Sequence, residues 1–573
     1  MISVRAAGEA GQGVESSSAG FAKAMMRSGF HVFVLLDYHS RIRGGHNFAT
    51  VRISTEPLWS HSEPVHILLA LDEEAIPRHL SQIVPGGAII YDENHQVNPE
   101  TLGGDILAVP APIIRIAREV GGKELMANTV AFAIAAGLME LPLEPIEGII
   151  QENFRKKGSA VVASNLRVSR VAYEWARENY ARRIPFRLTP RAMPGRMLMN
   201  GNEAFALGAL LGGCKFVAGY PMTPGSPVLE WMAAHAARYG VVAMQVEDEI
   251  AALNMAVGAA YAGVRAMTTT SGGGFSLMVE ALGLAGMTET PVVIYEAQRP
   301  GPSTGMATRT EQGDLLFVLH ASQGEFPRIV LAPGTIEQAF ETGWRAFNLA
   351  ERYQCPVIVL SDHYLATSLR DVTQEALGLE KLEIDRGKLL SEAQLDALPE
   401  REYKRYAFTE DGISPRAVPG HPKGVYTVMS DEHDEMGHIT EDPVNRRLMM
   451  EKRMRKLKLA LNEMRPPSLY GPEEAEITFV GWGSTYGPLR EAVDRLNAGG
   501  VKANMVHIVD VWPFPAEAVK NILSRARRLI AVENNYSGQM ADLIRMMTGI
   551  EIKERILKYD GRPLSPEFIM KGV

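Results

Sequence analysis

The chain has 573 residues, of which 46% are apolar and 22% charged, and its formal net charge is −8. This length exceeds what a single hydrophobic core organises, so it predicts three or four domains of ordinary globular composition. The negative charge argues against broad electrostatic binding to nucleic acid or to an anionic membrane, and no apolar run is long enough to span a bilayer.

Two further features bear on location and redox chemistry. The N-terminus lacks the basic and then apolar segments of a signal peptide, so we expect a cytoplasmic protein. The two cysteines, Cys214 and Cys355, are far apart in the sequence. They exclude a disulfide framework, and an iron–sulfur cluster held by cysteines needs more thiolates. Any redox cluster is therefore expected on another polypeptide.

The first segment, residues 1–185, alternates expected strands and helices. A strand (2–6), a Gly-rich turn, a helix (15–28) and a second strand (31–36) predict a parallel sheet covered by helices. Further strands are expected at 48–53, 65–70, 87–91 and 105–109, and helices at 128–138 and 145–154. The basic, proline-containing stretch 182–194 is predicted to be a linker.

Gly8, Gly11 and Gly13 lie where the first strand meets the first helix, a place that suits a phosphate. Asp37 ends the next strand, where a ribose-binding carboxylate would lie, but the spacing Gly-x-x-Gly-x-Gly reverses the dinucleotide fingerprint. A nicotinamide site and a tight turn without a ligand both stay open. Arg43 precedes a glycine pair where the backbone could approach an anion; a solvated loop is the alternative.

The second segment, residues 195–370, predicts a buried parallel sheet. Strands are expected at 216–218, 241–246, 266–269, 291–296, 328–331 and 357–360, and helices at 201–211, 227–237 and 249–262. Three of the strands run into polar loops, which are expected to converge on one crevice at the carboxyl edge of the sheet. One loop carries Glu247, Asp248 and Glu249, and capping of the following helix would by itself explain these acids.

Residues 371–465 are predicted to be a polar excursion that ends in a basic helix, 444–464. Residues 470–573 return to alternation, with strands at 477–481, 502–507 and 528–533 and a helix at 486–497. The run 431–438 is crowded with possible metal ligands, but adjacent residues of this kind are usually a solvated loop.

Taken in order, the motifs resemble the 2-oxoacid:ferredoxin oxidoreductases. Gly11-Gln12-Gly13, Asp37-Tyr38, Arg43-Gly44-Gly45 and Val51-Arg52-Ile53-Ser54 resemble the gamma domain of that family, although Ala10 stands where the family more often has a glycine. Tyr-Pro-Met-Thr-Pro (220–224), Glu-Asp-Glu-Ile-Ala-Ala (247–252), the glycine-rich stretch 269–278 and Gln-Arg-Pro-Gly-Pro-Ser-Thr-Gly (298–305) resemble the pyrimidine-binding domain of its alpha subunit.

The resemblance implies a multidomain α/β protein made of parallel-sheet αβ sandwiches. Its parts would be a gamma domain (1–185), a thiamine-diphosphate pyrimidine-binding domain (195–370), the polar excursion with its connecting helix (371–465) and a transketolase C-terminal-like domain (470–573).

The resemblance also implies roles for individual residues. Glu249, which Gly258 follows nine positions later, would bind the aminopyrimidine of thiamine diphosphate; this interaction favours the imino tautomer, in which the exocyclic nitrogen is a base. Thr223 would lie near the thiazolium and the substrate, and Arg299 would pair with the substrate carboxylate, with a surface ion pair as the alternative. Further cofactor contacts are implied for Tyr220, Pro221, Gly11, Gly13 and Arg43, and substrate contacts for Ser303 and Thr304.

Enzymes that use thiamine diphosphate hold its diphosphate through Mg²⁺ at a Gly-Asp-Gly motif, which this sequence lacks; Asn534-Asn535 is expected to be a loop. The resemblance therefore implies a beta subunit that carries Mg²⁺ and a 4Fe–4S cluster, a dimer of heterodimers, and coenzyme A and ferredoxin as reaction partners.

The fusion of gamma and alpha segments without a beta segment resembles the two-subunit 2-oxoglutarate enzymes, which implies 2-oxoglutarate as substrate, with pyruvate or a branched-chain 2-oxoacid as the alternative. Two other classes stay open, an NAD-dependent oxidoreductase and a non-catalytic adaptor.

Overall fold

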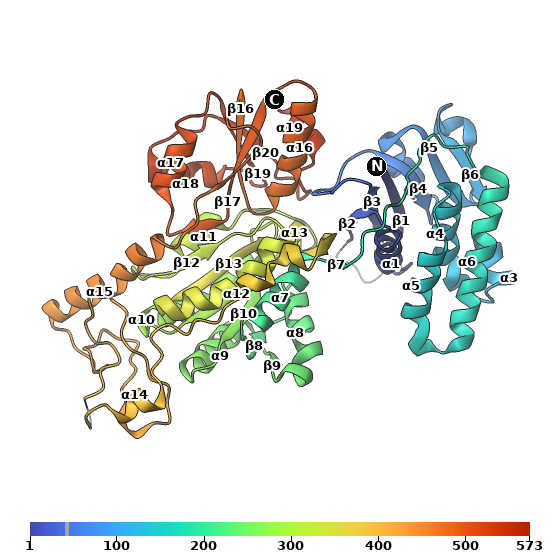
Figure 1. The fold of residues 1–573 in the computed structure, drawn as a ribbon. Helices are drawn as coiled ribbons and strands as arrows, with labels where there is room; N and C mark the ends of the chain where they lie inside the picture. Colours follow the sequence, from blue (N-terminus) through green and yellow to red (C-terminus); the bar gives the residue numbers. More distant parts are fainter. Residues whose placement is uncertain (40–44, 401) are drawn as a thin grey trace. The chain divides into compact units, whose positions relative to one another are not determined.

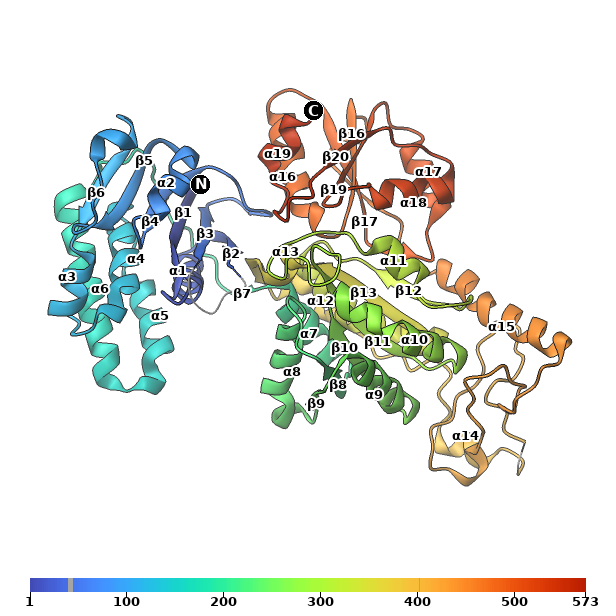
Figure 2. The same ribbon diagram turned by 180° about the vertical axis from the view of Figure 1, so that it is seen from behind.

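The computed structural model describes residues 1–39, 45–400 and 402–573, which form two compact units (Figure 1; Figure 2). Unit 1 comprises Met1–Met199, Thr367–Gln374 and Ser565–Phe568, and unit 2 comprises Asn200–Ala366, Glu375–Leu564 and Ile569–Val573. Among the described residues, no helix has both the length and the apolarity needed to cross a membrane. Both units contain sheets covered by helices, so the expected α/β class is confirmed.

Unit 1 is built on an eight-stranded sheet in the order β6-β5-β4-β1-β3-β2-β14-β7. Its strands are β1 (Ile2–Glu9), β2 (His31–Asp37), β3 (His46–Ser54), β4 (Val65–Ala70), β5 (Ile83–Asp92), β6 (Leu107–Ala111), β7 (Arg196–Met199) and β14 (Leu369–Thr373). Its helices are α1 (Val14–Arg27), α2 (Ala75–His79), α3 (Ile113–Glu119), α4 (Ala127–Leu138), α5 (Glu144–Phe154) and α6 (Ser159–Tyr180). The larger apolar core lies between one face of the sheet and α1, α4, α5 and α6.

This sheet is mixed. β1, β4, β5 and β6 are mutually parallel, whereas β3 is antiparallel to both β1 and β2. A parallel pair needs a long crossover, while neighbours joined by a short connection, such as β2 and β3, run antiparallel. β1 and β2 run in the same direction, because both are antiparallel to the β3 strand between them. The expectation of parallel strands is therefore right for these two and for β4, β5 and β6, and wrong for β3.

Beyond β2, the sheet continues with β14, a strand from much later in the chain. β14 pairs antiparallel with both β2 and β7. Its buried Asp371 accepts a hydrogen bond from the Val32 backbone N–H at 2.7 Å, approaches the His31 Nδ1 at 3.1 Å and forms an ion pair with Arg196 of β7. Burial, and then the charge of Arg196, lower the pKa of His31 to about 4, so this imidazole is neutral at neutral pH.

Unit 2 contains a seven-stranded sheet in the order β18-β12-β13-β11-β10-β8-β9. Its strands are β8 (Phe216–Gly219), β9 (Val242–Gln245), β10 (Ala266–Thr270), β11 (Val292–Gln298), β12 (Ile329–Leu331), β13 (Pro356–Asp362) and β18 (Asp510–Trp512). Its helices are α7 (Gly201–Leu211), α8 (Ser226–Tyr239), α9 (Glu249–Tyr261), α10 (Gly272–Met287), α11 (Leu315–His320), α12 (Ile336–Tyr353) and α13 (His363–Thr367), which leads into β14. One apolar core cluster contains residues of α7, α8 and α12, and a second contains residues of α9, α10 and α11. Helices therefore cover both faces of this sheet.

A second sheet of unit 2 has the order β15-β17-β16-β19-β20. Its strands are β15 (Ser468–Tyr470), β16 (Ile477–Trp482), β17 (Ala503–Ile508), β19 (Leu529–Glu533) and β20 (Glu554–Leu557), and its helices are α16 (Tyr486–Ala498), α17 (Ala516–Leu523) and α18 (Gln539–Thr548). The last helix, α19 (Pro566–Lys571), begins in unit 1 and ends in unit 2. Trp482, Val506 and Leu543 belong to the same apolar cluster as Phe275 of α10. The two sheets of unit 2 therefore share a core.

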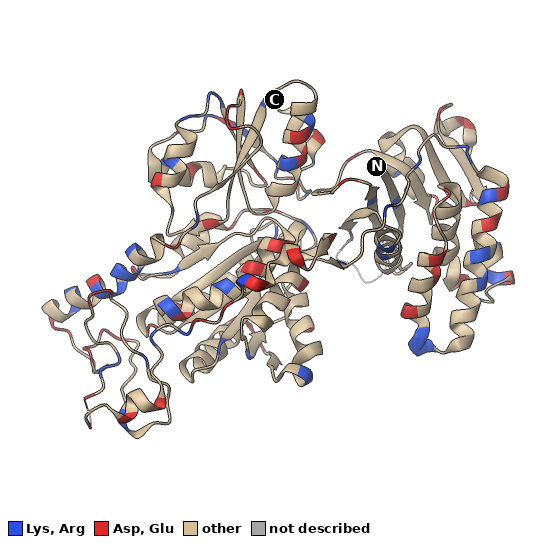
Figure 3. Ribbon diagram, in the orientation of Figure 1, with Lys and Arg blue, Asp and Glu red and all other residues tan. Residues whose placement is uncertain are grey.

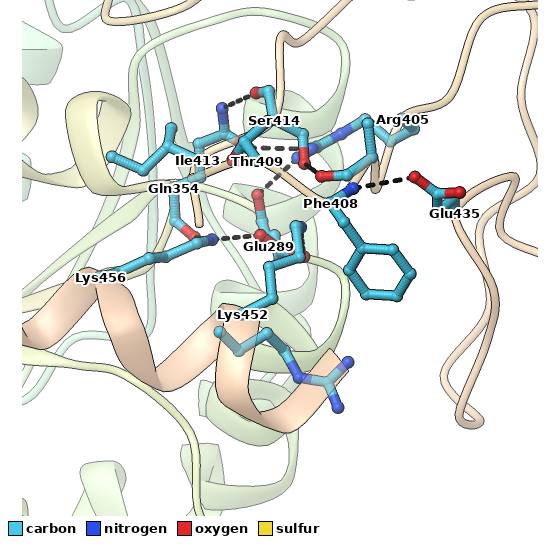
Figure 4. Close-up of polar contacts among 12 residues, drawn as sticks. Glu289, Gln354, Arg405, Phe408, Thr409, Ile413, Ser414, Glu435, Lys452 and Lys456 are labelled. Carbon is cyan, nitrogen blue, oxygen red and sulfur yellow. Dashed lines mark hydrogen bonds and ion pairs between the residues drawn. The ribbon is translucent and has the colours of Figure 1, made fainter. Parts of the chain in front are cut away.

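The polar excursion has little regular structure beyond α14 (Glu392–Asp396) and α15 (Pro443–Leu461). Figure 3 shows several basic residues along α15, and some of them face inward: Lys452 and Lys456 are buried against Glu289, which is fully buried between α10 and β11 (Figure 4). Arg405 donates to the Glu289 carbonyl at 2.7 Å and to the Gln354 Oε1 at 2.8 Å. We name Glu289, Gln354, Arg405, Lys452 and Lys456 the anchor cluster, because they attach the excursion to the first sheet's helical layers.

Candidate active site

Four loops of unit 2 follow neighbouring parallel strands, in the sheet order β11-β10-β8-β9. Two hydrogen bonds show how closely they approach one another. The Thr269 Oγ1 donates to the Gly225 carbonyl at 3.3 Å, and the Arg299 Nη1 donates to the Thr223 carbonyl at 2.7 Å. The structure thus brings the polar loops together at the carboxyl edge of the sheet, as the sequence predicts, and adds the loop that follows β11.

The three consecutive acidic residues before and at the start of α9 differ in their surroundings. Glu247 is exposed. Asp248 is the N-cap of α9, and its Oδ1 accepts from the Ala251 backbone N–H at 2.8 Å. Glu249 is only 3% exposed, and its Oε1 has no hydrogen-bond donor within the described part of the chain. Capping therefore explains Asp248 but does not explain the buried carboxyl of Glu249.

Glycines surround this carboxyl. A Cβ atom on Gly274 would stand 2.7 Å from both the Cγ and the Oε1 of Glu249, and it would also collide with the Thr270 hydroxyl. Gly272–Gly274, expected to form a loop, instead make the first turn of α10 after its N-cap Ser271. The backbone of this turn therefore packs directly against the Glu249 carboxyl, a close approach that glycine at position 274 allows.

Tyr220, Pro221 and Thr223 lie in the loop between β8 and α8. Tyr220 is 40% exposed, Pro221 is exposed and Thr223 is half-buried. Two hydrogen bonds hold this loop in place. The Asn202 Nδ2 donates to the Pro224 carbonyl at 2.9 Å, and the Tyr295 hydroxyl in turn donates to the Asn202 Oδ1 at 2.8 Å. Thr223 is therefore fixed at the same edge as Glu249.

Arg299 follows β11 directly and is half-buried. Burial lowers the pKa of its guanidinium, and the charges of Asp314 and Glu249 oppose that shift. Ser303 and Thr304 lie further along the same loop and are exposed. Ser303 has φ 56°, a left-handed conformation that costs a non-glycine residue about 1–2 kcal/mol. The structure thus brings Arg299 to Thr223 and leaves both hydroxyl residues accessible.

Sequence reasoning missed two acidic residues of this site, Glu296 and Asp314. Glu296 is fully buried on β11, and Asp314 occupies the N-cap position of α11 without capping it. The signal that could have identified Glu296 is its spacing from Gln298, since side chains two apart on a strand share a face.

Gly11 and Gly13 belong to unit 1. Gly13 is the N-cap of α1, with φ 75°, and Gly11 has φ 96°. Both line a cavity of about 400 Å³ whose acidic wall contains Glu9, Glu15 and Asp37. Arg43, the third predicted contact in this unit, lies outside the described residues.

The other stretches with possible ligand residues have structural explanations. Glu432 forms ion pairs with Arg446 and Arg453, and the His433 ring is buried, with its Nδ1 3.0 Å from the Asp431 carbonyl. Asn534 and Asn535 lie between β19 and α18, where they bond to the backbone and side chain of Gln312. The expectation of a loop at 534–535 is confirmed. No group of three or more His, Cys, Asp or Glu side chains that could hold a metal occurs in the described residues.

Three family models match the chain. Residues 207–453 match the model of pyruvate flavodoxin/ferredoxin oxidoreductase that describes its thiamine diphosphate-binding part. Residues 3–175 match that of pyruvate ferredoxin/flavodoxin oxidoreductase, and residues 475–569 match core domain II of pyruvate:ferredoxin oxidoreductase.

Individual proteins match over comparable lengths. The chain is 36% identical to the alpha subunit of 2-oxoacid:ferredoxin oxidoreductase 2 of Aeropyrum pernix, over 98% of this chain and 96% of that one. It is 34% identical to the 2-oxoglutarate synthase subunit KorA of Methanothermobacter thermautotrophicus, over 66% of this chain and 99% of that protein. Among solved structures, the 2-oxoglutarate:ferredoxin oxidoreductase of Magnetococcus marinus, with 2-oxoglutarate, coenzyme A and succinyl-CoA bound, matches with a TM-score of 0.92 and 34% identity over 100% of this chain and 98% of that one.

Proposed function

Because the chain belongs to the 2-oxoacid:ferredoxin oxidoreductase family, as an alpha subunit, we propose that it supplies the aminopyrimidine half of a thiamine diphosphate site that a separate beta subunit completes. The observation that carries this proposal is the buried Glu249 carboxyl, whose Oε1 finds no donor among the described residues. An acceptor buried without a partner is unfavourable in an isolated chain, and the protonated ring nitrogen of an aminopyrimidine would satisfy it.

The surroundings of Glu249 fit the cofactor. The Gly274 backbone packs against the carboxyl, so a side chain at this position would displace the carboxyl from the place where the ring nitrogen is expected. When bound, thiamine diphosphate supplies the carbon nucleophile for decarboxylation of a 2-oxoacid. Glu249 holds a proton at the pyrimidine N1′ and so makes the exocyclic amine basic, which is general acid–base catalysis through the cofactor. Tyr220 and Pro221, which are exposed in the loop that carries Thr223, are proposed to contact the cofactor as well.

Gly274→Ala is expected to lower turnover of the assembled enzyme by about a hundredfold, because an added Cβ displaces the Glu249 carboxyl and misplacement by about 1 Å costs a reaction that much. Gly273→Ala is the matched control, since its Cβ would meet only the Ser303 carbonyl, at 3.6 Å. Steady-state turnover, with circular dichroism to check the fold, measures both. Equal losses in the two variants would contradict the special role of residue 274.

The substrate's carboxylate is assigned to Arg299. Its guanidinium offers several donors in a planar fork, which suits a carboxylate, and one of them is already fixed on the Thr223 carbonyl. Thr223 would then lie near the reacting carbon, and the exposed Ser303 and Thr304 would line the approach. The proposal is supported by the position of these residues on loops that follow strands of one sheet.

The diphosphate-binding motif and the cluster-binding cysteines, which this chain lacks, are assigned to its partner subunit. The sequence contains no Gly-Asp-Gly motif and only two cysteines, so we assign the Mg²⁺ that holds the diphosphate, and a 4Fe–4S cluster, to the beta subunit. Electrons would leave that cluster for ferredoxin. A dimer of such alpha–beta heterodimers is the assembly we expect.

Coenzyme A is proposed to accept the acyl group. The reaction then converts a 2-oxoacid, coenzyme A and oxidised ferredoxin into an acyl-CoA, carbon dioxide and reduced ferredoxin, or runs in reverse. The cavity beside Gly11 and Gly13 is the proposed place for coenzyme A contacts. Its carboxylates favour a ribose hydroxyl over a phosphate there, so phosphate contacts would come from the helix N-terminus and from Arg43.

We propose 2-oxoglutarate as the substrate, supported by the KorA relative and by the Magnetococcus structure. The test is to express the chain with its beta subunit and to assay viologen reduction with 2-oxoglutarate, pyruvate and branched-chain 2-oxoacids. We expect no activity from this chain alone and the highest kcat/KM for 2-oxoglutarate in the assembled enzyme. Turnover by the isolated chain would refute the two-subunit site, and hydride transfer to nicotinamide without iron would favour the dehydrogenase alternative.

A further inference from the structure

Two carboxyl groups beside the candidate site lie close together. Glu296 is fully buried. Apart from another carboxyl group, no donor in the described parts of the chain bonds to either of its carboxyl oxygens. Gln298, two positions along β11, points to the same face, and its Oε1 accepts from the Asp314 backbone N–H at 3.0 Å. Asp314 is therefore held over the face from which the Glu296 carboxyl projects.

The Asp314 carboxyl is equally confined. Its Oδ2 is buried without a donor among the described residues, and a Cβ on Gly272 would stand 2.9 Å from its Cγ. Burial and then the neighbouring Asp314 raise the pKa of Glu296 well above its usual range. Burial also raises the pKa of Asp314, while the hydrogen bond with Glu296 and the charge of Arg299 oppose that rise. Two adjacent carboxyls of this kind cannot both ionise and therefore share one proton.

The charged groups that face this pair are few. Arg299 interacts with Asp314 and with Glu249, and Glu311 adds a further negative charge near Asp314. If Glu296 were ionised as well, Arg299 would face an excess of carboxylates, which would repel an anionic substrate. The protonation state of Glu296 thus sets the charge balance around Arg299.

We propose that Glu296 is a positioning residue that stays protonated and donates to Asp314, so that one carboxylate charge faces Arg299 and holds its guanidinium ready for the substrate carboxylate. This inference rests on the role proposed above for Arg299. Loss of the shared proton places a second negative charge beside Arg299 and weakens the binding of a 2-oxoacid. The effect acts on KM for the 2-oxoacid more than on kcat, because the pair does not contact the reacting atoms.

The test uses the assembled enzyme and compares Glu296→Gln with Glu296→Ala. Glutamine keeps a donor for Asp314 but cannot ionise. In the wild type, we expect KM for the 2-oxoacid to rise as the pH becomes alkaline. In Glu296→Gln, KM should stay within a few-fold of the wild-type value at neutral pH and should not show the alkaline rise. Glu296→Ala should raise KM about tenfold, the scale of one buried hydrogen bond. Rescue by glutamine with loss of the pH response is not expected of a residue that only fills space.

A second readout is independent of turnover. The infrared difference spectrum, wild type minus Glu296→Gln, should contain the carbonyl stretch of a protonated carboxyl at neutral pH. Absence of that band, or an alkaline rise of KM that persists in Glu296→Gln, would overturn the proposal. Arg299→Gln separates the two assignments: an unchanged KM in this variant removes the proposed substrate role of Arg299, and with it the substrate part of this proposal, while the infrared band still reports whether the carboxyls share a proton.

Discussion

Replacing Glu249 with alanine is expected to lower turnover of the assembled enzyme by about two to four orders of magnitude, the usual contribution of a positioned acid–base group. The carboxyl is 3% exposed and lacks an internal donor among the described residues, so its removal should affect the cofactor far more than the fold. Turnover with a saturating 2-oxoacid and coenzyme A, together with the thermal unfolding temperature, distinguishes the two effects. We expect a large loss of rate and little change in unfolding temperature.

Glu247→Ala provides the matched control, because this acid lies two residues earlier and is exposed. Its turnover should stay near that of the wild type. Intact turnover in Glu249→Ala would instead favour an adaptor role for the chain. A loss shared by both variants would point to the charge of the loop rather than to one carboxyl.

Replacing Glu289 with alanine is expected to destabilise the attachment of the excursion by about 3–5 kcal/mol, the cost of removing one member of a buried ion pair. The anchor cluster contains two lysines that contact this one carboxylate, Lys452 at 2.6 Å and Lys456 on the other oxygen. Without it, both ammonium groups stay buried without their counter-charge. Native-state hydrogen exchange of the α15 amides measures the free energy of opening for this region directly.

The control for this variant is Glu451→Ala, which removes the exposed ion pair with Arg447 on the same helix and should cost less than about 1 kcal/mol.

The pH dependence of stability supplies a second check on Glu289→Ala. Burial lowers the pKa of Lys452 to about 7, although Glu289 opposes the shift. Since this folded value lies below the unfolded value of 10.5, the lysine takes up protons more readily when unfolded, and stability from this group rises with pH across that window. The loss in Glu289→Ala should therefore be largest below pH 7 and should shrink as the lysines become neutral; a loss independent of pH would contradict the charge explanation.

Local patterning was enough to predict most of the helices and strands. Alternation of short apolar runs with Gly-rich turns located α7 and β4 to the residue, because these elements are bounded by glycine, proline or polar residues that interrupt the periodicity. The helical first turn at Gly272–Gly274 was missed, since consecutive glycines are poor helix formers and their conformation here depends on packing against Glu249 and Asp314.

Long-range pairing could not be predicted in this way. β14 joins the sheet of unit 1, and β18 joins the first sheet of unit 2; each has only a few residues, and nothing within them specifies a partner distant in sequence. The carboxyl pair of Glu296 and Asp314 is another case, because it forms only when β11 and the start of α11 are brought together. The resemblance to the family does imply Glu249, Thr223 and Arg299 as candidates, and their roles stay predictions until they are tested as described above.

The position of β14 affects the order in which the protein folds during synthesis. Unit 1 consists of three separate stretches of the polypeptide, and β14 carries Asp371, the buried partner of His31 and Arg196. A nascent chain that has emerged only as far as Met199 therefore has a sheet whose β2 edge is uncovered, and it must keep that edge from wrong pairings while the next part is translated. Completion of the eight-stranded sheet thus waits until the chain as far as Thr373 has left the ribosome, so folding of the N-terminal part depends on translation of the segment that follows it.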